Sequence, residues 1–131
     1  MIENTKLLNF DNLAFHKHPS CQDGIMAQLN MGDITISVVA NILQGDGLYG
    51  RVEMCQETEQ LDYLNGDYEV AMWRKGDSDM IPLGVGDDVL AGQTPAQVSK
   101  HMRDAQLNGD AWIDLLKKLR KDFREELGLD D

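Results

Sequence analysis

Apolar and polar side chains alternate regularly in two neighbouring stretches of the N-terminal half. In residues 25–30 and again in 34–39, every second side chain is a large or small aliphatic one. A Gly32-Asp33 pair lies between the two stretches. Two runs of period two around a tight Gly-Asp connection predict a β-hairpin.

A second hairpin is predicted around Asn65-Gly66, a strong turn dipeptide. The alternating segment 67–73 comes directly after this turn, so we expect it to pair with the residues before it, 48–64. Three other stretches are expected to be extended. They are an opening segment at 6–15, a strand at 48–54 and a short edge strand at 80–83.

The periodicity changes to that of a helix after Thr94, which is a good N-cap followed by proline. Asn108-Gly109 is expected to end this first helix, and Asp110 to cap a second one. The second helix carries one apolar stripe and ends at Gly128. The stripe consists of Trp112, Leu116, Leu119, Phe123 and Leu127.

Strands followed by helices predict an α+β fold in a single domain, residues 1–131. Residues 1–93 are expected to be mainly β and to form an antiparallel sheet of four to six strands. Residues 94–131 are expected to form two helices that pack on one face of that sheet.

The charge balance restricts the partners. Twelve basic and twenty-three acidic residues give a formal net charge of −11, which repels nucleic acid and anionic membranes. No stretch reaches the roughly 18 apolar residues of a membrane helix. The opening residues lack the pattern of a secretory signal, so Cys21 and Cys55 are expected to be free thiols in a cytoplasm.

Several short segments, taken in order, resemble a family of small uncharacterised bacteriophage proteins. The resemblance covers residues 9–106 and rests on a Phe-rich start, an SVV strand, a Tyr-Gly pair, a YEVA strand and a DV segment before a helix. The matching positions are Phe10, Ser37, Val38, Val39, Tyr49, Gly50, Tyr68, Glu69, Ala71, Asp88 and Val89. The helix at 110–127 has no counterpart in that family. The resemblance implies a phage accessory protein in the host cytoplasm and no particular activity.

One cluster could bind a metal. His16, His18 and Cys21 have the spacing H-x-H-x2-C, and Cys55 or His101 could supply a fourth zinc ligand. Closed zinc sites usually show paired Cys or His motifs, so we favour surface histidines on a polar connection. No other motif indicates a cofactor, a nucleophile or a phosphate-binding loop. A small metal-dependent enzyme using His16 and His18 is therefore the weaker hypothesis.

The favoured hypothesis is a non-enzymatic protein that occupies a surface of a host protein, for host takeover or anti-defence. A more specific version is an acidic mimic of nucleic acid, whose carboxylates occupy the positions of phosphates. We expect the stripe of the last helix to cover the sheet. The alternative is an interface with a host protein or with a second copy, through Trp112, Leu116, Leu119 and Phe123.

Overall fold

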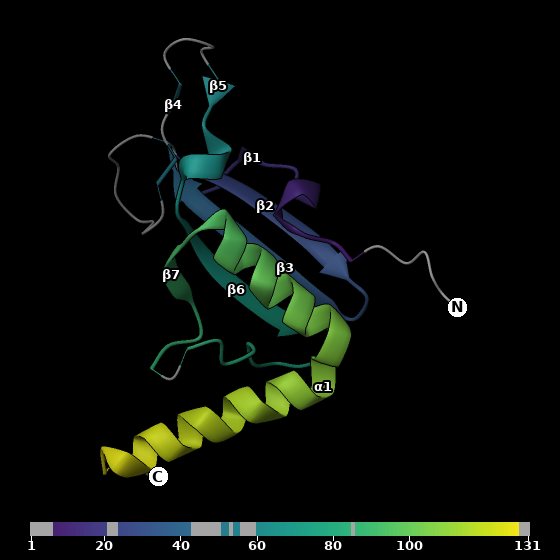
Figure 1. Cartoon of the computed structure of the whole chain (residues 1–131), viewed down its shortest axis with the longest axis vertical. Helices are drawn as coiled ribbons and strands as arrows, with labels where there is room; N and C mark the ends of the chain where they lie inside the picture. Colours follow the sequence, from purple (N-terminus) through teal and green to yellow (C-terminus); the bar gives the residue numbers. More distant parts are fainter. Residues whose placement is uncertain are drawn as a thin grey trace.

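The centre of the fold is one five-stranded antiparallel sheet with the strand order β1-β2-β3-β6-β7 (Figure 1). Its strands are β1 (His16–Lys17), β2 (Gly24–Met31), β3 (Ile34–Asn41), β6 (Tyr68–Arg74) and β7 (Leu90–Gln93). A separate two-stranded sheet pairs β4 (Met54–Cys55) with β5 (Gln60–Leu61). Two 3-10 turns, η1 (Phe10–Asn12) and η2 (Tyr63–Asn65), and one helix, α1 (Pro95–Glu126), complete the chain. This computed structural model describes residues 7–20, 24–42, 51–52, 54–55, 60–84 and 86–128.

The predicted hairpin between β2 and β3 is confirmed. Its register runs from Gly24 opposite Asn41 to Met31 opposite Ile34, so the turn is formed by Gly32 and Asp33. Gly32 has a φ of +79°, a conformation that glycine adopts without steric cost. The predicted α+β class and antiparallel sheet are confirmed with it.

The second predicted hairpin is wrong in its pairing. β6 pairs along its length with β3, with Val38 opposite Val70, and on its other side with β7. In the described chain, the residues before the turn pair with this segment through an isolated backbone bridge between Arg51 and Asp67, the residue before β6. β6 presents alternate apolar residues to the core, so it gains more as a central strand than as half of an isolated hairpin.

Three smaller strand predictions also change. The opening segment forms η1, and the first strand begins only at His16. The expected edge strand at 80–83 is reduced to a bridge between Trp73 and Met80. Residues 48–50 and 53 of the expected strand at 48–54 lie outside the described residues, and the described Met54 belongs to β4.

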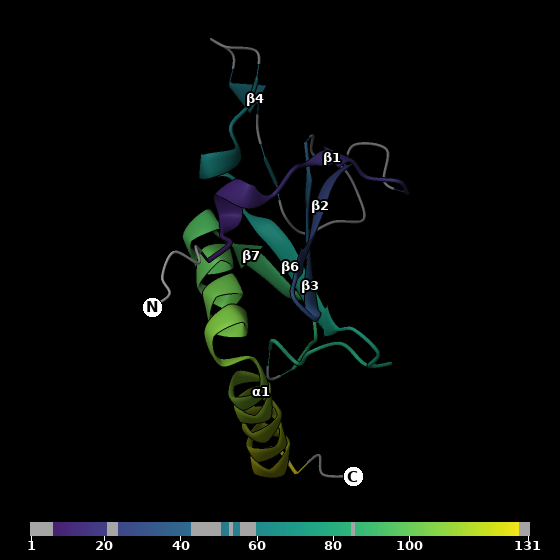
Figure 2. The ribbon, with the colours of Figure 1, turned by 90° about the vertical axis from the view of Figure 1, so that its right-hand side faces the viewer.

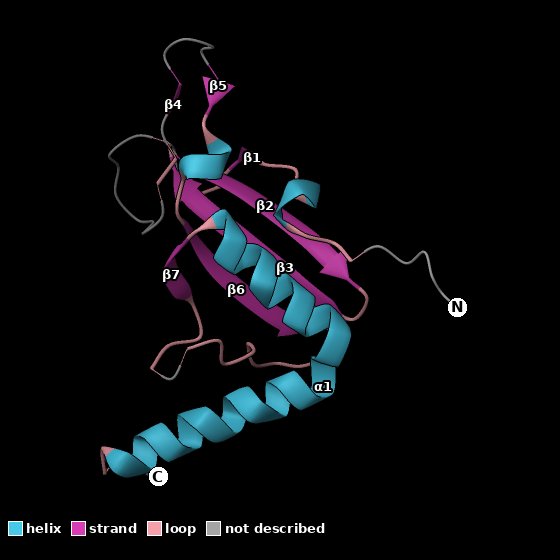
Figure 3. Cartoon of the chain, viewed as in Figure 1, coloured by secondary structure: helices cyan, strands magenta, loops and turns pink. Residues whose placement is uncertain are grey.

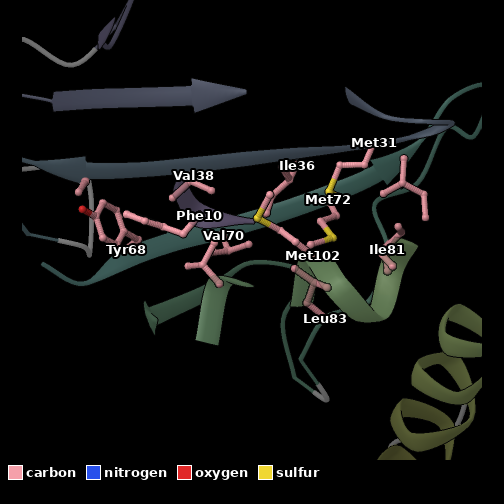
Figure 4. Packing of buried hydrophobic residues seen from close by; sticks show 14 of the residues in the cluster. Phe10, Met31, Ile36, Val38, Tyr68, Val70, Met72, Ile81, Leu83 and Met102 are labelled. Atoms are coloured by element: carbon pink, nitrogen blue, oxygen red, sulfur yellow. The ribbon is translucent and has the colours of Figure 1, made fainter. Parts of the chain in front are cut away.

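The core lies between one face of the sheet and the first half of α1 (Figure 2). Val98, Met102 and Ala105 of the helix are buried there, as the helical spacing predicted. They lie against fully buried side chains of the two central strands, shown close by in Figure 4. These strand residues are Ile36, Val38, Val70 and Met72.

The prediction of two C-terminal helices is wrong, because one helix spans Pro95–Glu126. Its start is as predicted, with Thr94 and Gln97 forming a reciprocal capping box. Asn108 has non-helical φ and ψ of −132° and 23°, and the helix bends there without ending (Figure 3). Asp110 lies inside the helix and binds Arg74 instead of serving as an N-cap.

Candidate interaction surface

The part of α1 beyond the bend leaves the sheet and extends from one end of the molecule (Figures 1 and 2). We call residues 109–128 the arm. Its base is anchored in the core by Trp112 and Ile113, which are 9% and 3% exposed. Leu116 is partly buried and also packs against the core. Apolar burial therefore fixes the first turns of the arm and not its whole length.

Two arginines tie the arm to the rest of the protein, one to a loop and one from strand β6. Arg120 Nη1 donates to Asp88 Oδ1 at 2.6 Å, and Arg120 Nε and Nη2 both donate to the carbonyl oxygen of Gly84. Arg74 of β6 donates to Asp110 Oδ1 at 2.5 Å. Both carboxylates are substantially exposed, so these ion pairs orient the arm more than they stabilise the fold.

The arm leaves an apolar stripe in solvent. Leu115, Leu119 and Leu127 are 52%, 46% and 55% exposed, and Phe123 beside them is half-buried. The expectation that the stripe covers the sheet is wrong beyond Leu116, because the bend at Asn108 carries the arm away from the sheet. Clustered large apolar side chains in solvent are typical of a binding surface.

Sequence reasoning missed Leu115 as a member of this exposed stripe. The signal was present, since Leu115, Leu119, Phe123 and Leu127 succeed one another at spacings of four and so share one helix face. The expected stripe included Trp112 instead, which the structure places in the core. From here on, the stripe means these four residues.

The arm also differs from the rest of the chain in charge. Residues 109–128 contain five basic and five acidic side chains and are formally neutral, whereas the whole chain carries −11. Most of the excess of negative charge, −9 of the −11, therefore belongs to residues 1–108, the body of the protein. A partner that binds the arm meets an apolar, uncharged stripe beside an acidic body.

The candidate metal ligands do not form a cluster in the described chain. His16 is exposed on β1, with its Nδ1 2.9 Å from the carbonyl oxygen of Lys17. His18 Nδ1 accepts a hydrogen bond from the backbone N–H of Ser20 at 3.0 Å. Cys21 lies outside the described residues. Among the residues that are described, no group of three His, Cys, Asp or Glu side chains could hold a metal ion.

His101 lies at the other edge of the sheet from these histidines. It belongs to α1, and its Nε2 is 2.8 Å from Oε1 of Gln93 in β7, whereas His16 lies on β1. It is thus a packing residue that holds the helix to the edge strand. The structure does not bring it to His16 and His18.

We expect His101 to weaken the fold in mild acid. Burial, and secondarily the charge of Lys100, lower the pKa of His101 below 6.5, with Asp104 opposing the shift. The unfolded chain then binds more protons, so the free energy of unfolding should fall as pH drops through 6.5 toward the folded-state pKa. Urea unfolding at pH 7.5 and 5.0 measures this. His101→Gln should lose less stability over that interval, and an equal loss would contradict the assignment.

Comparison of the chain with protein-family models, curated protein sequences and solved structures found no match. The resemblance to phage proteins therefore stays a prediction. In the described part of the chain, no helix combines the length and the apolar character required to cross a membrane.

Proposed function

We propose that this chain is a phage accessory protein that acts by binding a host protein in the host cytoplasm, without catalysing a reaction. The observation that carries the proposal is the exposed stripe of the arm. A helix that offers apolar residues at regular spacings of four suits insertion into an apolar groove of a partner. The ordered segments that resemble phage proteins supply the biological setting.

Charge favours a different protein over a second copy as the partner. Two copies joined through their arms would bring together two bodies that each carry a formal charge of −9 over residues 1–108, with seven basic and sixteen acidic side chains. Like-charge repulsion opposes that association. A host protein with basic side chains around an apolar groove would bind the stripe in its groove and would also be attracted by the acidic body. Such a combination suits a host nucleic-acid-binding protein and agrees with the mimicry hypothesis.

The test compares two single substitutions on the arm. Leu119→Gln removes an apolar side chain from the stripe, and Lys121→Gln changes an exposed residue on the same arm but outside the stripe. The wild-type chain is used to capture a protein from host lysate, and the captured protein is then purified. Its affinity for the three chains is measured by calorimetry at 150 mM salt.

We expect Leu119→Gln to weaken binding at least tenfold, because burial of one large apolar side chain is worth about 1.5–3 kcal/mol. Lys121→Gln should remain within about twofold of the wild type. Equal affinities of all three chains would show that the stripe is not the binding surface. A wild-type chain that is dimeric through the stripe in light scattering would replace the host partner by a second copy.

A further inference from the structure

A pocket lined by aromatic and aliphatic side chains lies beside η1 and η2. These two turns lie at the end of the molecule away from the arm (Figures 1 and 2). Its volume is about 340 Å³. Its lining residues are Phe10, Asp11, Leu13, Phe15, Tyr63 and Leu64. Five of the six are apolar or aromatic, and the sixth is a carboxylate.

The aromatic side of the pocket is held in place by ring packing. The ring centroids of Phe15 and Tyr63 are 5.1 Å apart with planes 22° apart, and Phe15 lies 5.5 Å from Tyr68 at 29°. Tyr68 is fully buried, and its hydroxyl donates to the carbonyl oxygen of Tyr63 at 2.7 Å. The buried phenol of Tyr68 therefore holds Tyr63, which lines the pocket, in place. The aromatic wall of the pocket is thus formed before a ligand binds.

The rim of the pocket combines apolar surface with negative charge. Leu64 is 67% exposed at the rim, and Leu13 is half-buried. Asp11 is exposed, and its backbone N–H is bound at 2.9 Å by the side-chain oxygen of Asn9, which fixes the start of η1. Within the described ranges no basic side chain pairs with the Asp11 carboxylate.

The surroundings of the aromatic cluster are also negative. Burial raises the pKa of the Tyr68 phenol, and Tyr63, Asp62 and Asp67 raise it further. The same negative potential that opposes a phenolate stabilises a cation near these rings. A neutral apolar ligand would use the rings and leucines but gain nothing from the carboxylate.

We propose that this pocket binds an arginine side chain of a protein partner. The planar guanidinium stacks on aromatic rings and also pairs with a carboxylate, here Asp11. The three methylene groups of arginine would lie along Leu13 and Leu64, as long charged side chains do on apolar surface. This site goes beyond the proposed function, because it lies at the opposite end from the arm and does not depend on the stripe.

The test titrates the full chain with N-acetyl-arginine amide and monitors the ring signals of Phe15 and Tyr63 by NMR. N-acetyl-citrulline amide, which has the same shape without the charge, and N-acetyl-lysine amide are the comparison probes. Asp11→Asn removes the carboxylate charge, and Leu64→Gln changes the apolar rim. Asp114→Asn, on the arm, is the control for the loss of one negative charge.

We expect the arginine probe to bind at least fivefold more tightly than the citrulline probe and more tightly than the lysine probe. Asp11→Asn should weaken arginine binding at least fivefold, Leu64→Gln should weaken it to a smaller extent, and Asp114→Asn should leave it unchanged. Equal binding of arginine and citrulline, or unchanged binding to Asp11→Asn, would overturn the proposal. No host protein is used, so failure here is distinguishable from failure of the stripe.

Discussion

Replacing Trp112 by alanine should lower the free energy of unfolding by about 3–5 kcal/mol, the usual cost of truncating a buried tryptophan. Trp112 is 9% exposed and belongs to the main core cluster, although it lies just beyond the bend in α1. The substitution leaves a cavity at the point where the arm joins the sheet. Urea unfolding monitored by far-UV circular dichroism measures the change.

Leu119→Ala is the matched control for this prediction. The sequence places Leu119 on the same expected stripe as Trp112, but the structure leaves it 46% exposed. We expect the free energy of unfolding to change by no more than about 0.5 kcal/mol, as for most surface substitutions. A loss from Leu119→Ala as large as that from Trp112→Ala would mean that the arm packs against the body in solution.

Met102→Ala should cost about 2–5 kcal/mol, because Met102 is fully buried between the first half of α1 and the sheet. It is one of the largest fully buried side chains of the protein, and Figure 4 shows it directed toward Ile36 and Met72. The same unfolding experiment measures the loss. Truncation at this position removes packing between the helix and two central strands at once.

Leu107→Ala provides the comparison on the same half of the helix. Leu107 is 59% exposed, so its truncation removes little packing and should change stability by no more than about 0.5 kcal/mol. If Met102→Ala were as mild as Leu107→Ala, the helix would not be the main cover of the sheet. The placement of the core would then be wrong.

The parts of the fold that depend on local signals could be predicted from the sequence. Gly32-Asp33 lies between two alternating runs, and the turn alone fixes the register of β2 and β3. Thr94 and Gln97 define the start of α1 through reciprocal short-range hydrogen bonds, and Pro95 suits the first helical position through its fixed φ. In both cases the determining contacts lie within a few residues of each other.

The parts of the fold that depend on distant contacts could not be predicted. β6 pairs with β3, although β4, β5 and η2 lie between them in the chain. The alternation of apolar and polar residues in each strand does not specify which strand it pairs with. Asn108-Gly109 correctly indicates an interruption, but the pair itself does not decide whether the helix bends or ends. Trp112 and Ile113 are buried in the core just after the bend, and this burial stabilises the helical conformation beyond Asn108.

The candidate site shows the same division. Sequence reasoning identified the arm as an apolar face with two alternative uses, and only its burial distinguishes Trp112 in the core from Leu119 in solvent. The aromatic pocket could not be predicted, because Phe15 and Tyr63 are far apart in the chain and stack only after the sheet has formed. Arg120 likewise finds Gly84 and Asp88 through the tertiary fold.

The position of α1 after every strand of the sheet has a consequence for synthesis on the ribosome. β2, β3 and β6 are all translated before residues 98–105, the helical segment that covers them. Translation proceeds at about 5–20 residues per second, so the covering segment of α1 is synthesised on the order of seconds after the strands. During that interval the side chains of Ile36, Val70 and Met72 have no helix over them, and nascent chains with such surfaces aggregate. A chaperone that protects this surface should therefore be needed only during translation, until α1 has emerged.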